Sequence, residues 1–175
     1  MSVIESKKRL GFGLMRLPLL NPDNPANIDV EQVKQMVDTF LERGFTYFDT
    51  AWMYHSFQSE NVVKEALVDR YPRDSYTLAT KLHAGFIKTK EDRDKVFEEY
   101  FDYYLLHDIG FDHYKTYTDL DCFRWLMDKK EKGLVRHIGF SYHDNAELLD
   151  KVLTEHPEFE FVQLQINYLD WESEG

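Results

Sequence analysis

The chain contains 175 residues and carries a net charge of −11 at neutral pH, with 43% apolar and 15% aromatic residues. This length and composition are typical of one folded domain with a packed core, and they exclude an intrinsically disordered chain. The negative charge would repel phosphate backbones, so the composition also argues against a nucleic-acid-binding protein.

Cysteine content and hydropathy restrict the class of protein further. Cys122 is the only cysteine, so these residues hold no intramolecular disulfide and no cysteine-built zinc or iron–sulfur site. The N-terminal residues 1–10 lack the apolar stretch of a secretory signal, and no apolar run is as long as a membrane span. We therefore expect a cytoplasmic protein that does not bind membranes.

Short apolar runs alternate with longer amphipathic segments along the whole chain, which predicts repeated strand–helix units and a parallel sheet. The predicted strands are residues 9–15, 46–51, 76–81, 101–107, 135–140 and 159–167. The predicted helices follow them at about residues 30–43, 59–70, 90–99, 118–132 and 145–153. Six strands and five helices in this order belong to the α/β class.

Capping signals mark three of the predicted helix starts. Asp29 precedes Gln32 by three residues, Thr89 precedes Asp92, and Asp144 precedes Glu147, each with the spacing of a capping box. Gly44 follows the first helix where a left-handed glycine is common.

The element pattern predicts a (β/α)₈ TIM barrel of which about six strands and five helices are present. A closed barrel needs eight strands and typically ~250 residues. We therefore expect residues 1–175 to form a single barrel domain from which strands seven and eight are absent. The third helix runs into the fourth strand with no turn residue between them, so we also expect the chain to be shortened near Glu99 and Tyr100.

Four polar residues fall at or just beyond the carboxyl ends of three consecutive predicted strands. Asp49 lies near the end of the second strand, with Tyr54 in the following loop, and Lys81 and His107 end the third and fourth strands. The carboxyl ends of barrel strands carry function, and an acid, a phenol, an amine and an imidazole at one end indicate proton-transfer chemistry.

These residues lie in motifs that resemble the aldo-keto reductase family over nearly the whole chain. The motifs are GFGLMRLP at 11–18, FDTAWMYHSFQSE at 48–60, ATK at 79–81, DYYLLH at 102–107, GLVRHIGFS at 133–141 and VQLQINY at 162–168. The resemblance implies a (β/α)₈ barrel and NADPH-dependent reduction of aldehydes and ketones. The family's catalytic Asp, Tyr, Lys and His match Asp49, Tyr54, Lys81 and His107.

The expected roles of these four residues follow from their chemistry. A phenol with a pKa near 10 is a weak acid at neutral pH, and a nearby Lys81 cation would lower the pKa of Tyr54. Asp49 would keep Lys81 charged and in place, and His107 would donate a hydrogen bond to the substrate oxygen. The hydride would come from the cofactor.

By the same resemblance, the residues expected to bind the cofactor are Gly13, Met15, Ser141 and Gln163. Ser141 and Gln163 would hold the nicotinamide carboxamide, whereas the family's Asn after that serine is Tyr142 here. NADPH is the expected cofactor, and NADH remains an alternative, because the family's residues that bind the 2′-phosphate follow strand eight.

Loop residues near the strand ends are expected to form the substrate pocket. They are Trp52, Phe111 and His113, which would suit a small apolar or aromatic carbonyl compound. No pair of histidines has the spacing of a helical metal motif, so the sequence predicts no metal site. Cys122 is expected to be packed in the core rather than nucleophilic.

Two alternatives to an active reductase remain from the sequence. The chain could be a non-catalytic or truncated barrel that acts as a binding or assembly subunit, and its oligomeric state is open. The segments LPLLNPDNP at 17–25 and DWESE at 170–174 also resemble a bacterial branch with a C-terminal cysteine cluster for iron–sulfur centres. Such a cluster would lie beyond residue 175.

Overall fold

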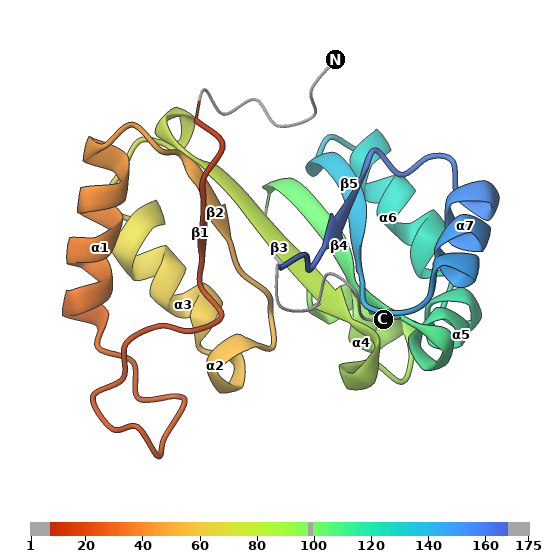
Figure 1. Cartoon of the computed structure of the whole chain (residues 1–175), viewed down its shortest axis with the longest axis horizontal. Coiled ribbons are helices and arrows are strands. Elements are labelled where there is room, and N and C mark those ends of the chain that lie inside the picture. Colours follow the sequence, from red (N-terminus) through yellow and green to blue (C-terminus); the bar gives the residue numbers. More distant parts are fainter. Residues whose placement is uncertain (1–7, 98–99, 168–175) are drawn as a thin grey trace. The chain divides into compact units, whose positions relative to one another are not determined.

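The computed structural model describes residues 8–97 and 100–167 and contains two units (Figure 1). Unit 1 is Met1–Thr80 and unit 2 is Lys81–Gly175. Strand β3 (Thr77–His83) runs across the division between the units. The segment 170–174, which carries part of the resemblance to the iron–sulfur branch, and residue 99 of the expected shortened junction lie outside the described residues.

Unit 1 contains three parallel strands and one long helix. Its strands are β1 (Gly11–Gly13), β2 (Tyr47–Asp49) and the first part of β3, with β2 paired to both neighbours. Its helices are α1 (Val30–Glu42), α2 (Tyr54–Phe57), α3 (Ser59–Val63), the π-helical η1 (Lys64–Val68) and the 3₁₀ turn η2 (Arg73–Ser75).

The apolar face of α1 forms the core of unit 1. Val33, Val37 and Phe40 are buried, and the ring of Phe40 lies 5.3 Å from Phe12 on β1 and 5.2 Å from Phe48 on β2, centroid to centroid. The expected cap is confirmed, because the Asp29 carboxylate accepts a hydrogen bond of 3.0 Å from the Gln32 backbone N–H. Burial of aromatic rings between the helix and the strands holds α1 against β1 and β2.

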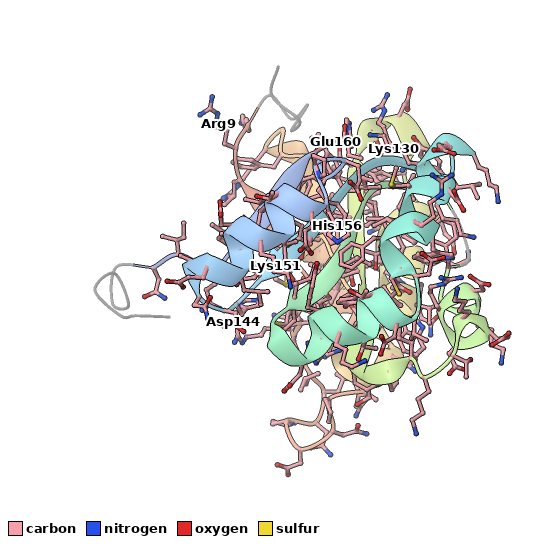
Figure 2. All side chains as sticks on the ribbon, turned by 90° about the vertical axis from the view of Figure 1, so that its right-hand side faces the viewer. Arg9, Lys130, Asp144, Lys151, His156 and Glu160 are labelled. Atoms are coloured by element: carbon pink, nitrogen blue, oxygen red, sulfur yellow. The ribbon has the colours of Figure 1, made fainter. Side chains whose placement is uncertain are left out.

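Unit 2 contains three further strands and the helices that follow them. Its elements are η3 (Ala84–Phe86), α4 (Lys90–Lys95), β4 (Phe101–Ile109), α5 (Phe111–Asp119), α6 (Cys122–Glu131), β5 (Val135–Tyr142), α7 (Ala146–Glu155) and β6 (Phe161–Leu164). β4 pairs with β5 and β5 with β6, all parallel. Lys130 of α6 and Glu160, which directly precedes β6, are labelled in Figure 2 and form an ion pair of 2.7 Å.

The predicted helix 118–132 is wrong in its extent. The structure has two helices here, α5 and α6, separated at Leu120 and Asp121. Asp121 has a left-handed backbone with φ of 56°, and the Arg93 guanidinium donates hydrogen bonds to the carbonyls of Leu120 (2.6 Å) and Asp121 (3.2 Å). The buried Arg93 thus satisfies the backbone at a break that periodicity alone did not reveal.

Other boundaries also differ from those predicted. The cap of α7 is Asn145, whose side chain accepts from the Leu148 backbone N–H at 2.9 Å, instead of Asp144. The capping box of Thr89 and Asp92 is present as predicted, although α4 ends at Lys95. The predicted helix 59–70 divides into α3 and η1, and the first, second and sixth strands are shorter than expected.

The predicted fold class is confirmed. Strands and helices alternate through both units, and the pairs β1–β2, β2–β3, β4–β5 and β5–β6 are all parallel, which is the arrangement of a partial (β/α)₈ barrel. None of the helices in residues 8–97 and 100–167 is long and apolar enough to cross a membrane.

Candidate active site

Two of the four expected catalytic residues lie in unit 1. Asp49 is the last residue of β2, and Tyr54 begins α2 with its side chain buried. Burial raises the pKa of Tyr54, and the negative charge of Asp49 raises it further, to a smaller extent. The positive charge of Arg16 acts in the opposite direction. The groups of unit 1 therefore keep the phenol protonated, which is opposite in direction to the effect expected from Lys81 of unit 2.

The turn that carries Tyr54 has an unusual backbone. His55, Ser56 and Phe57 all have positive φ, between 53° and 68°, a conformation that costs ~1–2 kcal/mol per non-glycine residue. The imidazole of His55 holds this turn, because its Nε2 accepts from the Leu17 backbone N–H at 3.0 Å and its Nδ1 lies 2.9 Å from the Pro25 carbonyl. The sequence analysis did not identify His55, since its role depends on contacts with Leu17 and Pro25 in the segment between β1 and α1.

The hydroxyl groups of Thr50 and Ser59 connect the elements around Tyr54. Their oxygens lie 2.8 Å apart in the buried interior, and the Ser59 hydroxyl lies 3.3 Å from the Leu14 carbonyl. These bonds join the residue after β2, the start of α3 and the residue after β1. The carboxyl ends of β1 and β2 are therefore held in a fixed relation to each other.

The other two expected catalytic residues lie in unit 2. Lys81, on β3, is almost completely buried, and His107, on β4, is buried as well. The pKa of His107 is lowered to about 3, chiefly by burial and next by the positive charge of Lys81. The imidazole is therefore neutral at physiological pH and carries one N–H to donate.

Tyr117 of α5 fixes the backbone on both sides of this histidine. Its buried hydroxyl accepts from the Ala84 backbone N–H at 2.9 Å and lies 2.8 Å from the Leu82 carbonyl and 2.7 Å from the His107 carbonyl. The ends of β3 and β4 are tied to α5 through this one oxygen. Sequence reasoning did not separate Tyr117 from the other tyrosines, because only the fold brings it to both strands.

The expected carboxamide-binding residues Ser141 and Gln163 are direct partners in the register of β5 and β6. The Ser141 hydroxyl oxygen accepts a hydrogen bond of 2.8 Å from the Asp108 backbone N–H. Accepting this bond leaves the hydroxyl proton available for donation. A serine and a glutamine side by side on adjacent strands provide the donor and acceptor groups that an amide ligand requires.

The remaining expected site residues are distributed between the two units. In unit 1, Gly13 ends β1, Met15 is exposed, and the Trp52 ring lies 4.6 Å from that of Phe57, centroid to centroid. In unit 2, α5 contains Phe111 and His113, so this expected loop begins a helix. The helix makes His113 part of an ordered element.

His113 lies beside two polar residues that the sequence analysis did not group with it. His83, Asp108 and His113 bring one possible ligand atom each to within 4.8 Å of one another. Their positions, 83, 108 and 113, fit no helical or loop metal motif, because the three ligands come from β3, β4 and α5. Only the fold therefore reveals this cluster.

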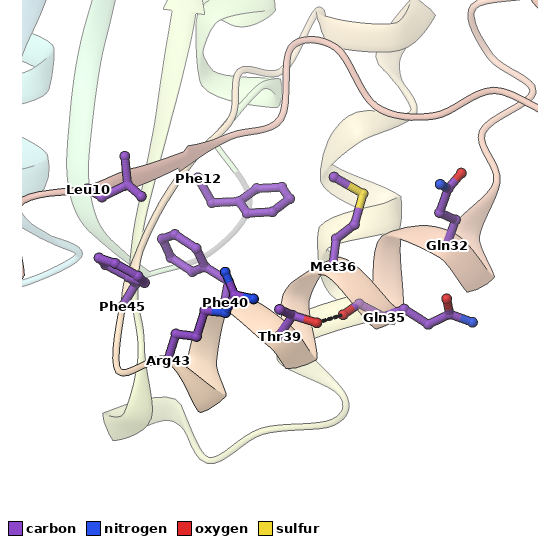
Figure 3. Close-up of a pocket in the computed structure, with 9 residues that line it drawn as sticks. All are labelled: Leu10, Phe12, Gln32, Gln35, Met36, Thr39, Phe40, Arg43 and Phe45. Atoms are coloured by element: carbon purple, nitrogen blue, oxygen red, sulfur yellow. Dashed lines mark hydrogen bonds between the residues drawn. The ribbon is translucent and has the colours of Figure 1, made fainter.

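A separate groove of about 440 Å³ lies in unit 1, between β1 and α1 (Figure 3). Its nine lining residues are Leu10, Phe12, Gln32, Gln35, Met36, Thr39, Phe40, Arg43 and Phe45. Arg43 is the one titratable group among them, and none of the expected site residues lines it. The groove therefore provides no acid–base chemistry and is not the candidate active site.

The model of the aldo/keto reductase family matches residues 9–174, which is nearly the whole chain. The chain belongs to the aldo/keto reductase family. A comparison with curated proteins found no match to this chain.

Solved structures with a similar fold include several members of this family. An aldo-keto reductase of Bacillus halodurans, AKR11C1 in its holo form, is 24% identical, with a TM-score of 0.66 over 90% of this chain and 53% of its own. A Klebsiella pneumoniae aldo-keto reductase in complex with NADPH is 19% identical, with a TM-score of 0.60 over 89% and 53%. A Brucella melitensis aldo/keto reductase is 21% identical, with a TM-score of 0.59 over 89% and 57%.

The aldo/keto reductase chain thus spans about half the length of these structures. The identities are low, so the likeness to each structure concerns the fold. It agrees with the partial (β/α)₈ barrel found in the two units.

Proposed function

We propose that this member of the aldo/keto reductase family reduces a small aldehyde or ketone, with Tyr54 as the general acid and NADPH as the hydride donor. The observation that carries the proposal is the presence of Asp49, Tyr54, Lys81 and His107 at the carboxyl ends of β2, β3 and β4 or just after them, in a chain whose family is shown. The NADPH complex of the Klebsiella pneumoniae relative supports the choice of cofactor.

Each catalytic side chain has a separate task in this proposal. Tyr54, which the groups of unit 1 keep protonated, donates its phenolic proton to the substrate oxygen as negative charge develops there. Neutral His107 donates a hydrogen bond to the same oxygen and orients it. Lys81 stabilises the phenolate that remains on Tyr54, and Asp49 provides the opposite charge for the lysine.

The bound cofactor supplies the hydride that reaches the carbonyl carbon. The residues of this chain fit a nicotinamide, because Ser141 and Gln163 are register partners with donor and acceptor groups for its carboxamide. Gly13 and Met15, at the end of β1 and just after it, would contact the same ligand. A preference for NADPH over NADH is part of the proposal.

The proposed substrate is a small carbonyl compound with an apolar or aromatic substituent. Trp52, next to Phe57 in unit 1, supports an apolar substituent, and Phe111 and His113 on α5 are the other residues proposed to contact the substrate. We place the reaction in the cytoplasm, with neither nucleic acid nor membrane as a partner. An iron–sulfur centre built on cysteines would need residues outside this chain, since Cys122 is its only cysteine and is buried.

The Tyr54→Phe variant tests the proposed reaction. Carbonyl-dependent oxidation of NADPH should fall by about 10²–10⁴-fold, because general acid catalysis contributes that factor. The affinity for NADPH, measured by the quenching of its fluorescence, should change little. Tyr71→Phe is the matched control, since the Tyr71 hydroxyl bonds to the Asp38 carboxylate at 2.5 Å and is not part of the proposed site.

Two results would contradict the proposal. Turnover that Tyr54→Phe leaves unchanged would remove Tyr54 as the acid. A folded wild-type chain that shows no carbonyl-dependent NADPH oxidation would instead favour the alternative of a binding or assembly subunit.

A further inference from the structure

Three side chains of unit 2, His83, Asp108 and His113, form a cluster next to His107. His83 ends β3, Asp108 lies near the end of β4, and His113 is on the first turn of α5. The ring centroids of His83 and His107 lie 5.3 Å apart. The cluster takes no part in the proton transfer described above.

Distances within the cluster are close to those of a metal site. The Asp108 Oδ2 atom lies 3.8 Å from His83 Nε2 and 3.5 Å from His113 Nδ1, and the two histidine ring centroids lie 4.7 Å apart. In a tetrahedral zinc site with bonds of ~2.0–2.1 Å, neighbouring ligand atoms are about 3.3 Å apart. Small side-chain shifts would therefore bring the three ligands to a common cation.

The backbone presents the Asp108 carboxylate to the two histidines. Asp108 has a left-handed conformation with φ of 54°, at a register irregularity of β4 between Leu106 and Ile109. Its backbone N–H is held by the Ser141 hydroxyl at 2.8 Å, and its carbonyl lies 2.8 Å from His113 Nδ1. A carbonyl only accepts, so in the metal-free chain His113 Nδ1 carries the proton. Coordination through Nδ1, the atom that lies 3.5 Å from Asp108 Oδ2, moves this proton to Nε2 and releases the bond to the Asp108 carbonyl.

Exposure and charge also suit a cation. The side chains of His83, Asp108 and His113 are 14%, 37% and 28% exposed, so solvent reaches the cluster and water can complete the coordination. Two imidazoles and one carboxylate are ligands that zinc and similar cations accept.

We propose that His83, Asp108 and His113 bind a divalent transition-metal cation of the Zn²⁺ type, with water in the remaining position. This site does not depend on the proposed reductase activity, because its test measures metal binding directly.

Metal binding requires a local rearrangement at His83. The His83 Nδ1 atom accepts a hydrogen bond of 3.0 Å from the Gly85 backbone N–H, so in the metal-free chain the proton lies on Nε2. Coordination by Nε2 moves this proton to Nδ1, and the Gly85 N–H must then leave Nδ1, because both atoms carry hydrogen. Zinc should therefore shift the Gly85 amide resonance in a heteronuclear NMR spectrum.

The test is a calorimetric titration of the purified, chelator-treated 175-residue chain with ZnCl₂. The wild type should bind one Zn²⁺ per chain, and His83→Gln, Asp108→Asn and His113→Gln should each weaken binding by at least about tenfold. Asn suits position 108 because it tolerates the left-handed backbone. The control is His156→Gln, because His156 Nδ1 also lies 3.3 Å from a carboxylate, that of Glu158, yet belongs to no three-ligand cluster among the described residues.

Further measurements keep the test decisive if a variant fails to fold. Circular dichroism identifies such a variant. Independently of the variants, Co²⁺ bound to the wild type should give the visible absorption of a four-coordinate site with nitrogen and oxygen ligands. No stoichiometric binding of Zn²⁺ to the wild type, equal binding by all three folded cluster variants, or an unchanged Gly85 resonance would each overturn the proposal.

Discussion

At the residue scale, burial sets the protonation of the candidate catalytic groups. Tyr54 and His107 are both buried, and burial is the largest cause of the raised pKa of Tyr54 and of the lowered pKa of His107. Desolvation disfavours the charged form of either group. The phenol is thus kept as a proton donor and the imidazole as a neutral hydrogen-bond donor, which are the states that the proposed carbonyl reduction requires.

The lowered pKa of His107 predicts a loss of stability in acid. Between about pH 6.5 and pH 3 the unfolded chain binds a proton at this histidine and the folded chain does not, so the free energy of unfolding falls as the pH falls. The slope from one such group is at most about 1.4 kcal/mol per pH unit. Urea unfolding at a series of pH values should show this slope, and it should be shallower in His107→Asn.

Direct titration provides a second measurement of the same group. A histidine with an ordinary pKa of about 6.5 changes its protonation, and hence its ring resonances, between pH 7.5 and pH 5. The ring resonances of His107 should not shift over this range in NMR spectra of the folded chain. A midpoint near 6.5 for His107 would contradict the prediction. His83 contributes to the stability slope in the same direction, so the site-specific titration separates the two histidines.

At the element scale, hydrogen bonds at the helix ends determine where the helices begin and break. Asp29, Thr89 and Asn145 each accept a backbone N–H in the first turn of α1, α4 and α7. Arg93 plays the corresponding part at the break before α6, where it donates to two carbonyls. The local sequence predicts most caps correctly, but the break between α5 and α6 depends on the side chain of Arg93, which belongs to α4.

The cap of α7 gives a prediction at this scale. Asn145→Ala should lower the free energy of unfolding by about 0.5–2 kcal/mol, because the Leu148 backbone N–H loses its acceptor. Asn145→Asp is the matched control, since aspartate keeps an acceptor at the same position. Urea unfolding measures both variants, and an equal loss in both would contradict the assignment of Asn145 as the cap.

At the scale of the whole molecule, the net charge of −11 determines which large partners the chain repels. Acidic residues pair with bases on the surface, as in the Lys130–Glu160 and Arg70–Asp38 ion pairs, but they outnumber the bases. A net negative field slows the approach of any polyanion. The field also acts on a phosphate-bearing cofactor, so local positive charge is needed where such a cofactor binds.

This charge predicts that the chain does not bind double-stranded DNA at physiological ionic strength. Fluorescence anisotropy of a labelled duplex should stay constant as the protein is added, because phosphate contacts provide most of non-specific affinity. A rise in anisotropy that weakens with added salt would contradict the prediction. Repeating the titration at low salt is the stricter form of the test, since screening is then smallest.

The sequence by itself determined the alternation of strands and helices, the class of fold and the motifs of the family. Periodicity and caps are local properties, so β4, β5, α1 and the cap at Asp29 follow from residues close together in the chain. It also supplied the identities of Asp49, Tyr54, Lys81 and His107, because these lie at strand ends within recognisable motifs.

Only the tertiary structure decided which residues that are far apart in the sequence lie close together in space. The division of the predicted helix 118–132 at Asp121 needs Arg93 from another element, and the turn after Tyr54 needs His55 in contact with Leu17 and Pro25. The cluster of His83, Asp108 and His113 likewise joins two strands and a helix. Such contacts depend on folding in three dimensions, which brings together side chains whose spacing in the sequence carries no signal.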